Sequence, residues 1–354
     1  MKKHNFSAGP CILPKEVLLK ASEAIMDFNG SGLSLIEISH RSKDFVAVME
    51  NARSLALELL DLTDKGYKAL FLHGGASLEF LMVAYNLLNV KAGYLNTGTW
   101  SDKAIKEAKL FGEVVEVGSS KDEDFKYIPK GYSVPGGLDY LHITSNNTIY
   151  GTQFKKFPKT DAPLVCDMSS DIFSRSLDFS QFDLIYAGAQ KNMGPAGATL
   201  VVIKEDILGK VSRKIPSMLD YQVHISKDSM FNTPPVFPVY TSMLTLEWLK
   251  NLGGIAAIEE INEKKARLLY SEIDLNPVFE GYANIEDRSL MNATFNLTDD
   301  SLKSTFENML KEAGIIGLNG HRSVGGYRAS MYNALSLESV GALVDVMSEM
   351  ERKG

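Results

Sequence analysis

One lysine of this chain, Lys191, lies in a sequence context that could make its amine reactive. It lies in segment 186–197 (YAGAQKNMGPAG), between the apolar runs 182–186 and 198–203. The small residues around it could offer the amine a cramped cleft at a strand end in place of solvent. Burial of that kind lowers the pKa of an amine and favours the neutral nucleophile that forms Schiff bases. The alternative is an exposed loop lysine whose neighbouring glycines serve only the turn.

An acidic residue, Asp167, directly follows the predicted strand 164–166. An ionised carboxylate at the end of a buried strand is costly without a cationic partner. A protonated pyridine nitrogen would be such a partner, and the pair would make that ring an electron sink. The alternative is that Asp167 caps the turn at 168–171.

Two further segments lie between a predicted strand and a predicted helix. In segment 73–77 (HGGAS), backbone N–H groups could cradle a phosphate at the helix N-terminus, although Ser77 as a helix cap explains the pattern nearly as well. Trp100 opens another helix and could stack on a flat cofactor ring, although a lone tryptophan is more often a packed anchor.

Basic residues form the third group of candidates, and they are His40, Arg41, His321, Arg322 and Arg328. Arg322 and Arg328 lie in the glycine-containing segment 320–333, which has no carboxylate. An arginine without a local acid is a candidate for bidentate binding of a carboxylate or phosphate. Each residue alone could equally be a solvated surface cation or an ion-pair partner.

Composition is that of an ordinary globular protein, with 354 residues of which 45% are hydrophobic and 23% charged. A net charge of −7 argues against nucleic acid or an anionic membrane as the partner. The two cysteines, Cys11 and Cys166, cannot form a disulfide framework, and no cysteine–histidine spacing predicts a metal site. Without a signal-peptide pattern or a long apolar run, the chain is predicted to be cytoplasmic.

Short apolar runs alternate with longer amphipathic ones over residues 66–203. This alternation predicts an α/β fold with a mostly parallel, doubly wound sheet and ligands at the carboxyl ends of its strands. The predicted strands are 68–72, 92–95, 113–117, 138–144, 164–166, 182–186 and 198–203, with helices at 77–88 and 100–110.

The C-terminal third predicts a smaller α+β domain. Its predicted elements, after a helix at 239–251, are helices at 255–273, 301–313 and 337–352 and a strand at 290–295. We therefore expect a large cofactor-binding domain at 15–255 and a small C-terminal domain at 256–354. The N-terminal segment 1–14 is expected to pack near the site.

Taken together, these segments resemble the phosphoserine aminotransferase family, whose members are pyridoxal-phosphate enzymes of the type I, aspartate-aminotransferase-like fold. The likeness covers essentially the whole chain, and its lysine motif and last motif are the specific ones. The segments are 6–10 (FSAGP), 38–42 (ISHRS), 73–75 (HGG), 96–100 (NTGTW), 145–151 (SNNTIYG), 167–170 (DMSS), 189–192 (AQKN) and 320–334 (GHRSVGGYRASMYNA).

The resemblance implies pyridoxal 5′-phosphate as the cofactor, in a homodimer. Lys191 would hold it covalently and move the α-proton, Asp167 would pair with the ring nitrogen, and Trp100 would stack on the ring. Thr148 would lie near the ring hydroxyl. The cofactor phosphate would be bound by Ala76, Ser77 and Gln190, and by Asn232 and Thr233 from the second subunit.

The resemblance also implies how substrates are bound. Arg328 would hold the α-carboxylate. His321 and Arg322, with His40 and Arg41 from the second subunit, would surround the substrate phosphate or distal carboxylate. Ser77 stands where some family members have arginine or cysteine, which puts in question a cationic contribution from that loop.

The implied activity is amino transfer from glutamate to 3-phosphooxypyruvate, which gives O-phosphoserine in serine biosynthesis. A phosphorylated four-carbon oxo acid of pyridoxal phosphate biosynthesis is a second possible acceptor. An alanine–glyoxylate-type aminotransferase would need fewer cations for the distal group. A cysteine desulfurase would need a late catalytic cysteine, and none follows Cys166. A cofactor-binding regulatory protein without turnover is the alternative from another class.

Overall fold

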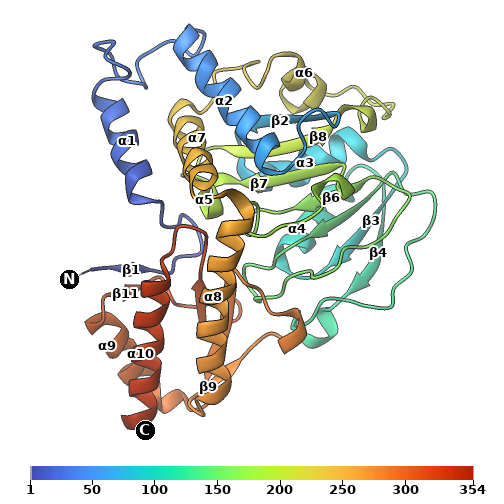
Figure 1. The fold of residues 1–354 in the computed structure, drawn as a ribbon. Coiled ribbons are helices and arrows are strands. Elements are labelled where there is room, and N and C mark those ends of the chain that lie inside the picture. The colour runs from blue at the N-terminus through green and yellow to red at the C-terminus, as the bar shows by residue number, and fades with distance from the viewer. Residues whose placement is uncertain (1, 354) are drawn as a thin grey trace.

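The structure is a computed structural model that describes residues 2–353, and its larger part is built on a seven-stranded sheet (Figure 1). The strands in spatial order are β2 (Tyr67–Leu72), β8 (Thr199–Lys204), β7 (Leu184–Gly188), β6 (Leu164–Asp167), β5 (Tyr140–Thr144), β3 (Lys91–Asn96) and β4 (Glu113–Ser119). β8 runs antiparallel to β2 and β7, whereas the other neighbouring pairs are parallel. The mostly parallel sheet predicted from the sequence is confirmed.

Helices cover both faces of this sheet, because its strands are apolar on both sides. In β8, Leu200 and Val202 join one hydrophobic cluster, and Val201 and Ile203 join another. The first cluster includes residues of α1 (Lys15–Met26), α2 (Lys43–Leu59) and α7 (Val236–Asn251), and the second includes residues of α3 (Gly75–Leu87), α4 (Thr99–Ala108) and α6 (Tyr221–Ser226). A short helix, α5 (Ala189–Asn192), follows β7 directly.

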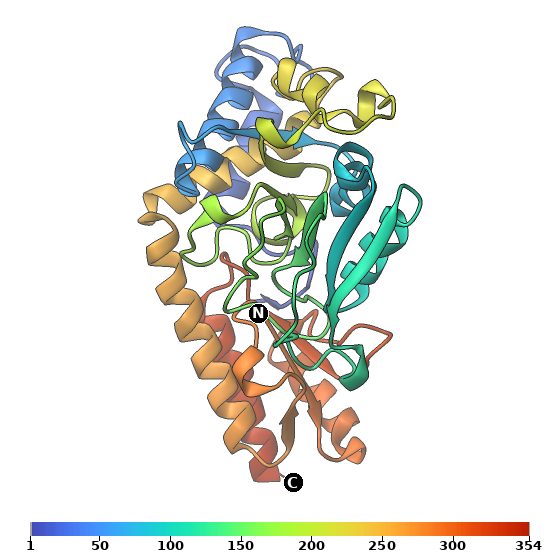
Figure 2. The ribbon, with the colours of Figure 1, turned by 90° about the vertical axis from the view of Figure 1, so that its right-hand side faces the viewer.

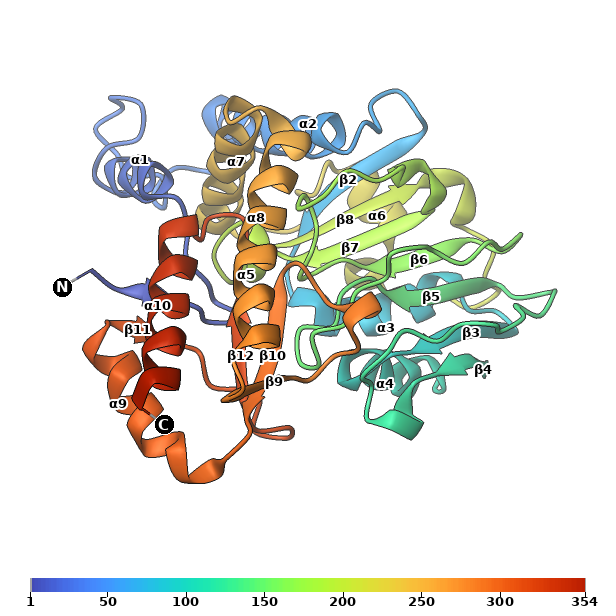
Figure 3. The same ribbon diagram turned by 60° about the horizontal axis from the view of Figure 1, so that its bottom comes forward.

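A smaller antiparallel sheet forms the second part of the molecule (Figure 3). Its order is β12 (Tyr327–Ser330), β10 (Asn292–Leu297) and β9 (Phe279–Gly281), with α9 (Lys303–Glu312) and α10 (Leu337–Lys353) packed nearby. β1 (His4–Asn5) pairs in parallel with β11 (Ile315–Ile316), which ties the N-terminal residues to this part.

Helix α8 (Gly254–Leu275) extends along one side of the molecule and connects the two parts (Figure 2). Ile255 and Ile258 near its start belong to a cluster of the large sheet, whereas Ala266 and Leu269 belong to the cluster of the small sheet. Both cores share this helix, and the division into 15–255 and 256–354 stays a prediction.

Most predicted elements are present, with ends displaced by a few residues. The helix predicted at 239–251 begins earlier, at Val236, so that Pro238 lies inside its first turn. Proline is tolerated there because the first N–H groups of a helix have no acceptor within it. Helices α1 and α2 and strand β12 lie where no element is predicted.

Short 3-10 helices occupy Lys121–Glu123, Phe179–Gln181, Glu205–Ile207, Ser217–Leu219, Ile285–Asp287 and Asp300–Leu302. Over residues 2–353, no helix is both long enough and apolar enough to cross a membrane.

Candidate active site

The polar segments singled out in the sequence meet at the carboxyl ends of the parallel strands. Asp167 ends β6, Lys191 lies on α5 just after β7, and Thr148 lies four residues beyond the end of β5. This is the edge at which open α/β sheets bind ligands.

Lys191 projects its amine into this site. Its Nζ donates a hydrogen bond to Oγ1 of Thr148 at 2.8 Å and lies 5.4 Å from the centroid of the Trp100 ring. Burial lowers the pKa of Lys191 to about 8, the charge of Asp167 opposes this shift, and the charge of Arg328 adds to it. The exposed-loop alternative is therefore wrong, and a large share of the amine is neutral near pH 8.

Asp167 is buried, with 4% of its surface exposed, and is the last residue of β6 rather than the residue after the strand. Its Oδ1 accepts a hydrogen bond from the N–H of Ser169 at 2.9 Å, so it does cap the turn that follows. Burial raises the pKa of Asp167, and the charge of Lys191 opposes that shift. Among the described residues Asp167 has no ion-pair partner within 4 Å, which leaves its charge available to a cationic ligand.

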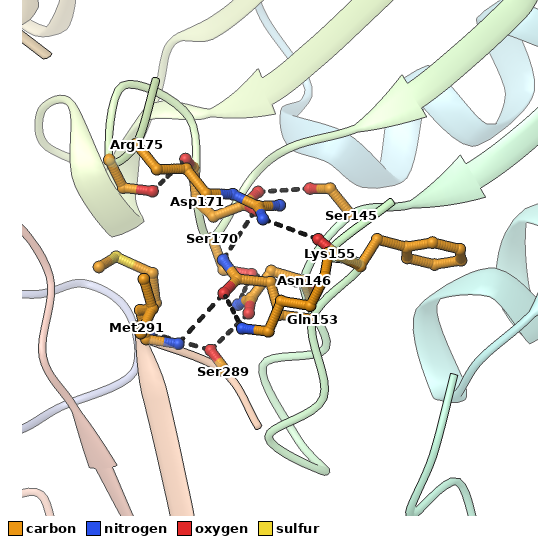
Figure 4. A network of polar contacts seen from close by, with 12 residues as sticks. Ser145, Asn146, Gln153, Lys155, Ser170, Asp171, Arg175, Ser289 and Met291 are labelled. Atoms are coloured by element: carbon orange, nitrogen blue, oxygen red, sulfur yellow. Dashed lines mark hydrogen bonds and ion pairs between the residues drawn. The ribbon is translucent and has the colours of Figure 1, made fainter. Parts of the chain in front are cut away.

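Buried polar contacts fix the loop that follows Asp167 (Figure 4). Asp171 accepts hydrogen bonds from Ser145 and from Nε2 of Gln153, and it pairs with Arg175 at 3.0 Å. A buried ion pair with these additional hydrogen bonds has its charges compensated, so the loop is held in one geometry.

Asn146 connects the same loop to the small sheet (Figure 4). Its Nδ2 donates to Oγ of Ser170 and to Oδ1 of Asn292, both at 2.8 Å, and its Oδ1 accepts a hydrogen bond from Ser289. The Asp167 loop and β10 are thereby joined through one side chain.

Arg328 reaches the site from β12 of the small sheet. Its Nη1 donates to the backbone carbonyl of Thr148 at 3.2 Å, and its Nε is buried without a partner. Burial lowers the pKa of Arg328, and no carboxylate pairs with it among residues 2–353. A guanidinium with unused N–H donors suits a carboxylate ligand.

Three cationic side chains act on His321, which precedes Arg322 in the chain. Burial lowers the pKa of His321, and the charges of Arg328, Arg322 and Lys103 lower it further. Positive charges that depress the pKa of a histidine create a potential that attracts an anion with more than one charge.

Lys103 was missed by the sequence reasoning. Its Nζ lies 4.6 Å from the centroid of the Trp100 ring, three positions earlier on α4. The spacing of three residues on a helix is the signal that could have found it, because such residues share one face. Trp100 itself keeps a buried Nε1 without a partner.

The N-terminus of α3 is open to an anion. Gly74 is its N-cap with φ of 95°, and no side chain caps the helix. Ser77 lies inside the first turn, so the alternative that it caps the helix is wrong. A Cβ added to Gly75 would meet nothing within 4 Å, and the N–H groups of Gly75, Ala76 and Ser77 can bind a phosphate in that space.

Gln190 lies beside Lys191, and the N-terminal segment packs against both. The N–H of Cys11 donates to the carbonyl of Gln190 at 3.1 Å, and the Cys11 thiol donates to the carbonyl of Lys191. A Cβ on Gly9 would lie 3.3 Å from Cγ of Lys191, so the close approach favours glycine there.

The remaining candidates do not meet Lys191 within one chain. His40 and Arg41 lie between α1 and α2, on a segment that Figure 1 places away from α5. Asn232 and Thr233 lie between α6 and α7, where the carbonyl of Thr233 accepts a hydrogen bond from His73 at 2.9 Å.

Known proteins are similar to this chain over its full length. The sequence profile of the aminotransferase class-V family matches residues 3–343. A curated phosphoserine aminotransferase of Flavobacterium psychrophilum is 70% identical over 355 residues, which cover 100% of both chains. The chain belongs to the phosphoserine aminotransferase family.

Solved structures of this family share the fold over the full length. The phosphoserine aminotransferase of Bacillus circulans subsp. alkalophilus is 42% identical, with a TM-score of 0.96 and coverage of 99% of each chain. A PLP-bound phosphoserine aminotransferase from Trichomonas vaginalis is 35% identical, with a TM-score of 0.92 and coverage of 98% of this chain and 100% of the other. The type I fold expected from the sequence is confirmed.

Proposed function

We propose that the protein is a pyridoxal-phosphate-dependent transaminase that moves an amino group between glutamate and 3-phosphooxypyruvate, with O-phosphoserine as the product. The observation that carries this proposal is the placement of Lys191. Its amine, with a pKa near 8, shares one strand edge with a buried unpaired carboxylate and a group of unpaired cations. Family membership favours this activity over the alanine–glyoxylate aminotransferase and cysteine desulfurase alternatives.

The site fits pyridoxal phosphate in charge and shape. The uncapped N-terminus of α3 suits the phosphate, Asp167 suits a protonated ring nitrogen, and the Trp100 ring offers a flat face. When bound, this cofactor supplies an electron sink for the carbanion that forms at the substrate α-carbon. The phosphate contacts of Ala76, Ser77 and Gln190 and the proximity of Thr148 to the ring hydroxyl are part of the proposal.

Side chains of the protein itself supply the nucleophile, carry the proton and bind the substrate. Lys191 in its neutral form acts as the nucleophile and carries the α-proton, since its lowered pKa lets it take and give a proton near neutrality. Arg328 binds the α-carboxylate that both amino acids share. His321 and Arg322, with Lys103 nearby, face the distal group, which is a phosphate in one substrate and a carboxylate in the other.

We also propose a homodimer in which His40, Arg41, Asn232 and Thr233 complete the partner's site. Apolar side chains of α1 and the segment after it are exposed, and they are Leu18, Leu19, Met26, Leu33 and Ile36. An exposed apolar surface of this kind supports a protein partner, and His40 and Arg41 end the same segment. The cytoplasmic location inferred from the sequence stays a prediction.

The activity is tested by a coupled assay for glutamate-dependent formation of O-phosphoserine, together with the visible spectrum of the purified protein. Lys191→Ala should abolish the visible absorption of the bound cofactor and nearly all turnover. Lys155→Met is the matched control, because burial lowers the pKa of Lys155 to about 8 as well, and its Nζ donates to the carbonyl of Arg288 instead. Normal turnover in Lys191→Ala, or activity with alanine and glyoxylate alone, would contradict the proposal.

The proposal that residues of both subunits form each site is tested by mixing subunits of two variants. Lys191→Ala and Arg41→Leu subunits, each nearly inactive alone, should regain activity when unfolded and refolded together, since one site of the hybrid dimer would be intact. No regain in a verified hybrid would place Arg41 outside the site.

A further inference from the structure

Three buried asparagines hold three consecutive carbonyl groups of the loop after Asp167. Each donates from its Nδ2 to one carbonyl, and the pairs are Asn192 with Ile172, Asn333 with Phe173 and Asn262 with Ser174. The exposed fractions of these asparagines are 7%, 5% and 0% for Asn192, Asn333 and Asn262. Three buried carbonyls in a row thus receive side-chain donors in a place where no strand or helix supplies them.

Hydrogen bonds also join the three asparagines to one another. The N–H of Asn333 donates to Oδ1 of Asn192 at 2.8 Å, and Nδ2 of Asn262 donates to Oδ1 of Asn333 at 2.9 Å. A carboxamide carries donors and an acceptor on one short side chain, so an aspartate or a leucine cannot replace it in this cluster.

Each asparagine comes from an element that carries, or is joined to, a candidate catalytic group. Asn192 follows Lys191 on α5, and Asn333 lies five positions after Arg328, just beyond the end of β12. The loop that they hold begins at Asp167. Asn262 lies on α8, which connects the two sheets.

The loop itself is strained where the cluster holds it. Phe173 is 1% exposed and has φ of 58°, a left-handed conformation that is unfavourable for a bulky residue. Such a conformation persists only where the surroundings over-determine it, and it occurs most often at functional sites. The hydrogen bonds to the carbonyls of Ile172, Phe173 and Ser174 are surroundings of that kind.

We propose that Asn192, Asn262 and Asn333 are positioning residues that fix Lys191, Asp167 and Arg328 relative to one another. None of the three is among the residues proposed to bind the cofactor or the substrate. They join the helix of the nucleophile, the loop of the buried carboxylate and the strand of the carboxylate-binding arginine through one buried cluster. The effect on catalysis rests on the proposed transaminase function, whereas the effect on the loop does not.

The test compares Asn333→Ala with Asn276→Ala. Asn276 is also buried, at 3% exposure, and its Nδ2 donates to the carbonyl of Met347 at 3.0 Å, at the end of α8 outside the site. Both variants lose a buried donor, so both should lower Tm. Only Asn333→Ala should lower kcat, by about tenfold or more, because small misplacements of reacting groups are costly.

Two measurements distinguish a loss of positioning at the site from a general loss of stability. In the apo-protein, hydrogen exchange at residues 168–175 should accelerate in Asn333→Ala and stay as in the wild type in Asn276→Ala. Asn192→Ala combined with Asn333→Ala should cost no more in kcat than the worse single variant, since both substitutions break one cluster.

Equal kcat in Asn333→Ala and Asn276→Ala, unchanged exchange at 168–175, or strictly additive losses would each overturn the proposal. If Asn333→Ala does not fold, Asn333→Ser replaces it, because serine keeps a donor and the same comparisons apply. A wild type without transaminase activity would refute the proposed function, and the exchange result would then still decide whether the cluster holds the loop.

Discussion

The Nζ of Lys191 and the Oγ1 of Thr148 lie 2.8 Å apart, and the carbonyl of Thr148 accepts a hydrogen bond from Arg328 at 3.2 Å. One residue thus contacts both the lysine of α5 and the arginine of the small sheet. A neutral amine that donates a single hydrogen bond keeps its lone pair, so the contact orients the Lys191 amine and leaves it free for the nucleophilic role proposed for it. The charge of Arg328 also helps to keep that amine neutral.

Capture of pyridoxal phosphate by the apo-protein should accelerate with pH and level off above a midpoint near 8. Burial lowers the pKa of Lys191 to about 8, and only the neutral amine attacks the aldehyde. Asp167 raises this pKa, so Asp167→Asn should move the midpoint down. Stopped-flow absorbance over pH 6–10 measures the rate, and a midpoint near the usual value for lysine, about 10.4, would contradict the burial argument.

Asp167→Asn should keep the fold and much of the cofactor binding yet lower transamination severely. A neutral amide cannot hold a ring nitrogen protonated, so the charge stabilisation that this carboxylate supplies is lost. The amide should still accept the hydrogen bond of Ser169, so the turn stays capped. Single-turnover kinetics with glutamate measure the effect, and a rate near that of the wild type would require another partner for the ring nitrogen.

The residues that local pattern can identify are those next to strand ends. Lys191, Asp167 and Trp100 are candidates of this kind, because each stands beside an apolar run that predicts a strand or opens a helix. The asparagine cluster could not be predicted in this way, since its hydrogen bonds join residues 71 and 141 positions apart and only tertiary packing brings them together.

The fold shows the same limit. Strand and helix types in residues 66–203 follow from hydrophobic periodicity. Helix α8 is also predicted, at 255–273, and the structure confirms it as Gly254–Leu275. What the local pattern does not carry is that the two ends of this helix pack into different cores. The pairing of β1 with β11 joins residues more than 300 positions apart, which no local pattern carries.

Lys265 should make the free energy of unfolding depend on pH. It is fully buried, its Nζ donates to the carbonyls of Met331 and Tyr332 at 3.0 and 2.9 Å, and burial lowers its pKa to about 7. The unfolded chain, with a lysine pKa near 10.4, then binds more protons than the folded protein between pH 7 and 10. The unfolding free energy of the wild type should therefore rise across that window relative to Lys265→Met.

Urea unfolding of the two proteins at several pH values measures this difference, in which other titrating groups cancel. A constant offset, from the hydrogen bonds that methionine cannot make, is expected at every pH. A difference that does not change between pH 7 and 10 would show that Lys265 has an ordinary pKa.

Lys103→Gln should weaken the use of O-phosphoserine more than that of glutamate. Its charge reaches His321, and a dianionic phosphate gains more from an added cation than a carboxylate does. Because Lys103 is exposed, the loss in kcat/KM should be only about two- to fivefold and should shrink as salt is added. Lys109→Gln, an exposed lysine at the opposite end of the same helix from Trp100, is the control, and an equal loss in both variants would assign the effect to net charge.

Arg328 and Arg322 should act on different ends of the substrate, and substitutions at the two positions should show this. Arg328 contacts Thr148 beside Lys191, so Arg328→Leu should lower kcat/KM for O-phosphoserine and glutamate alike. Arg322 adds its charge around His321, so Arg322→Leu should harm O-phosphoserine more, by about 10- to 100-fold if it makes a charged hydrogen bond to the phosphate.

Arg267→Leu is the matched control for the loss of an exposed arginine, since Arg267 only pairs with Glu263 at 3.8 Å on α8. Both substrates are measured in all three variants at fixed ionic strength, because screening by salt blurs differences between charged ligands. Equal losses for the two substrates in Arg322→Leu would remove the phosphate-binding role from the 320–326 loop. The specificity for a phosphorylated substrate would then have to come from Lys103 or from Arg41 of the proposed second subunit, which the mixed-subunit experiment tests directly.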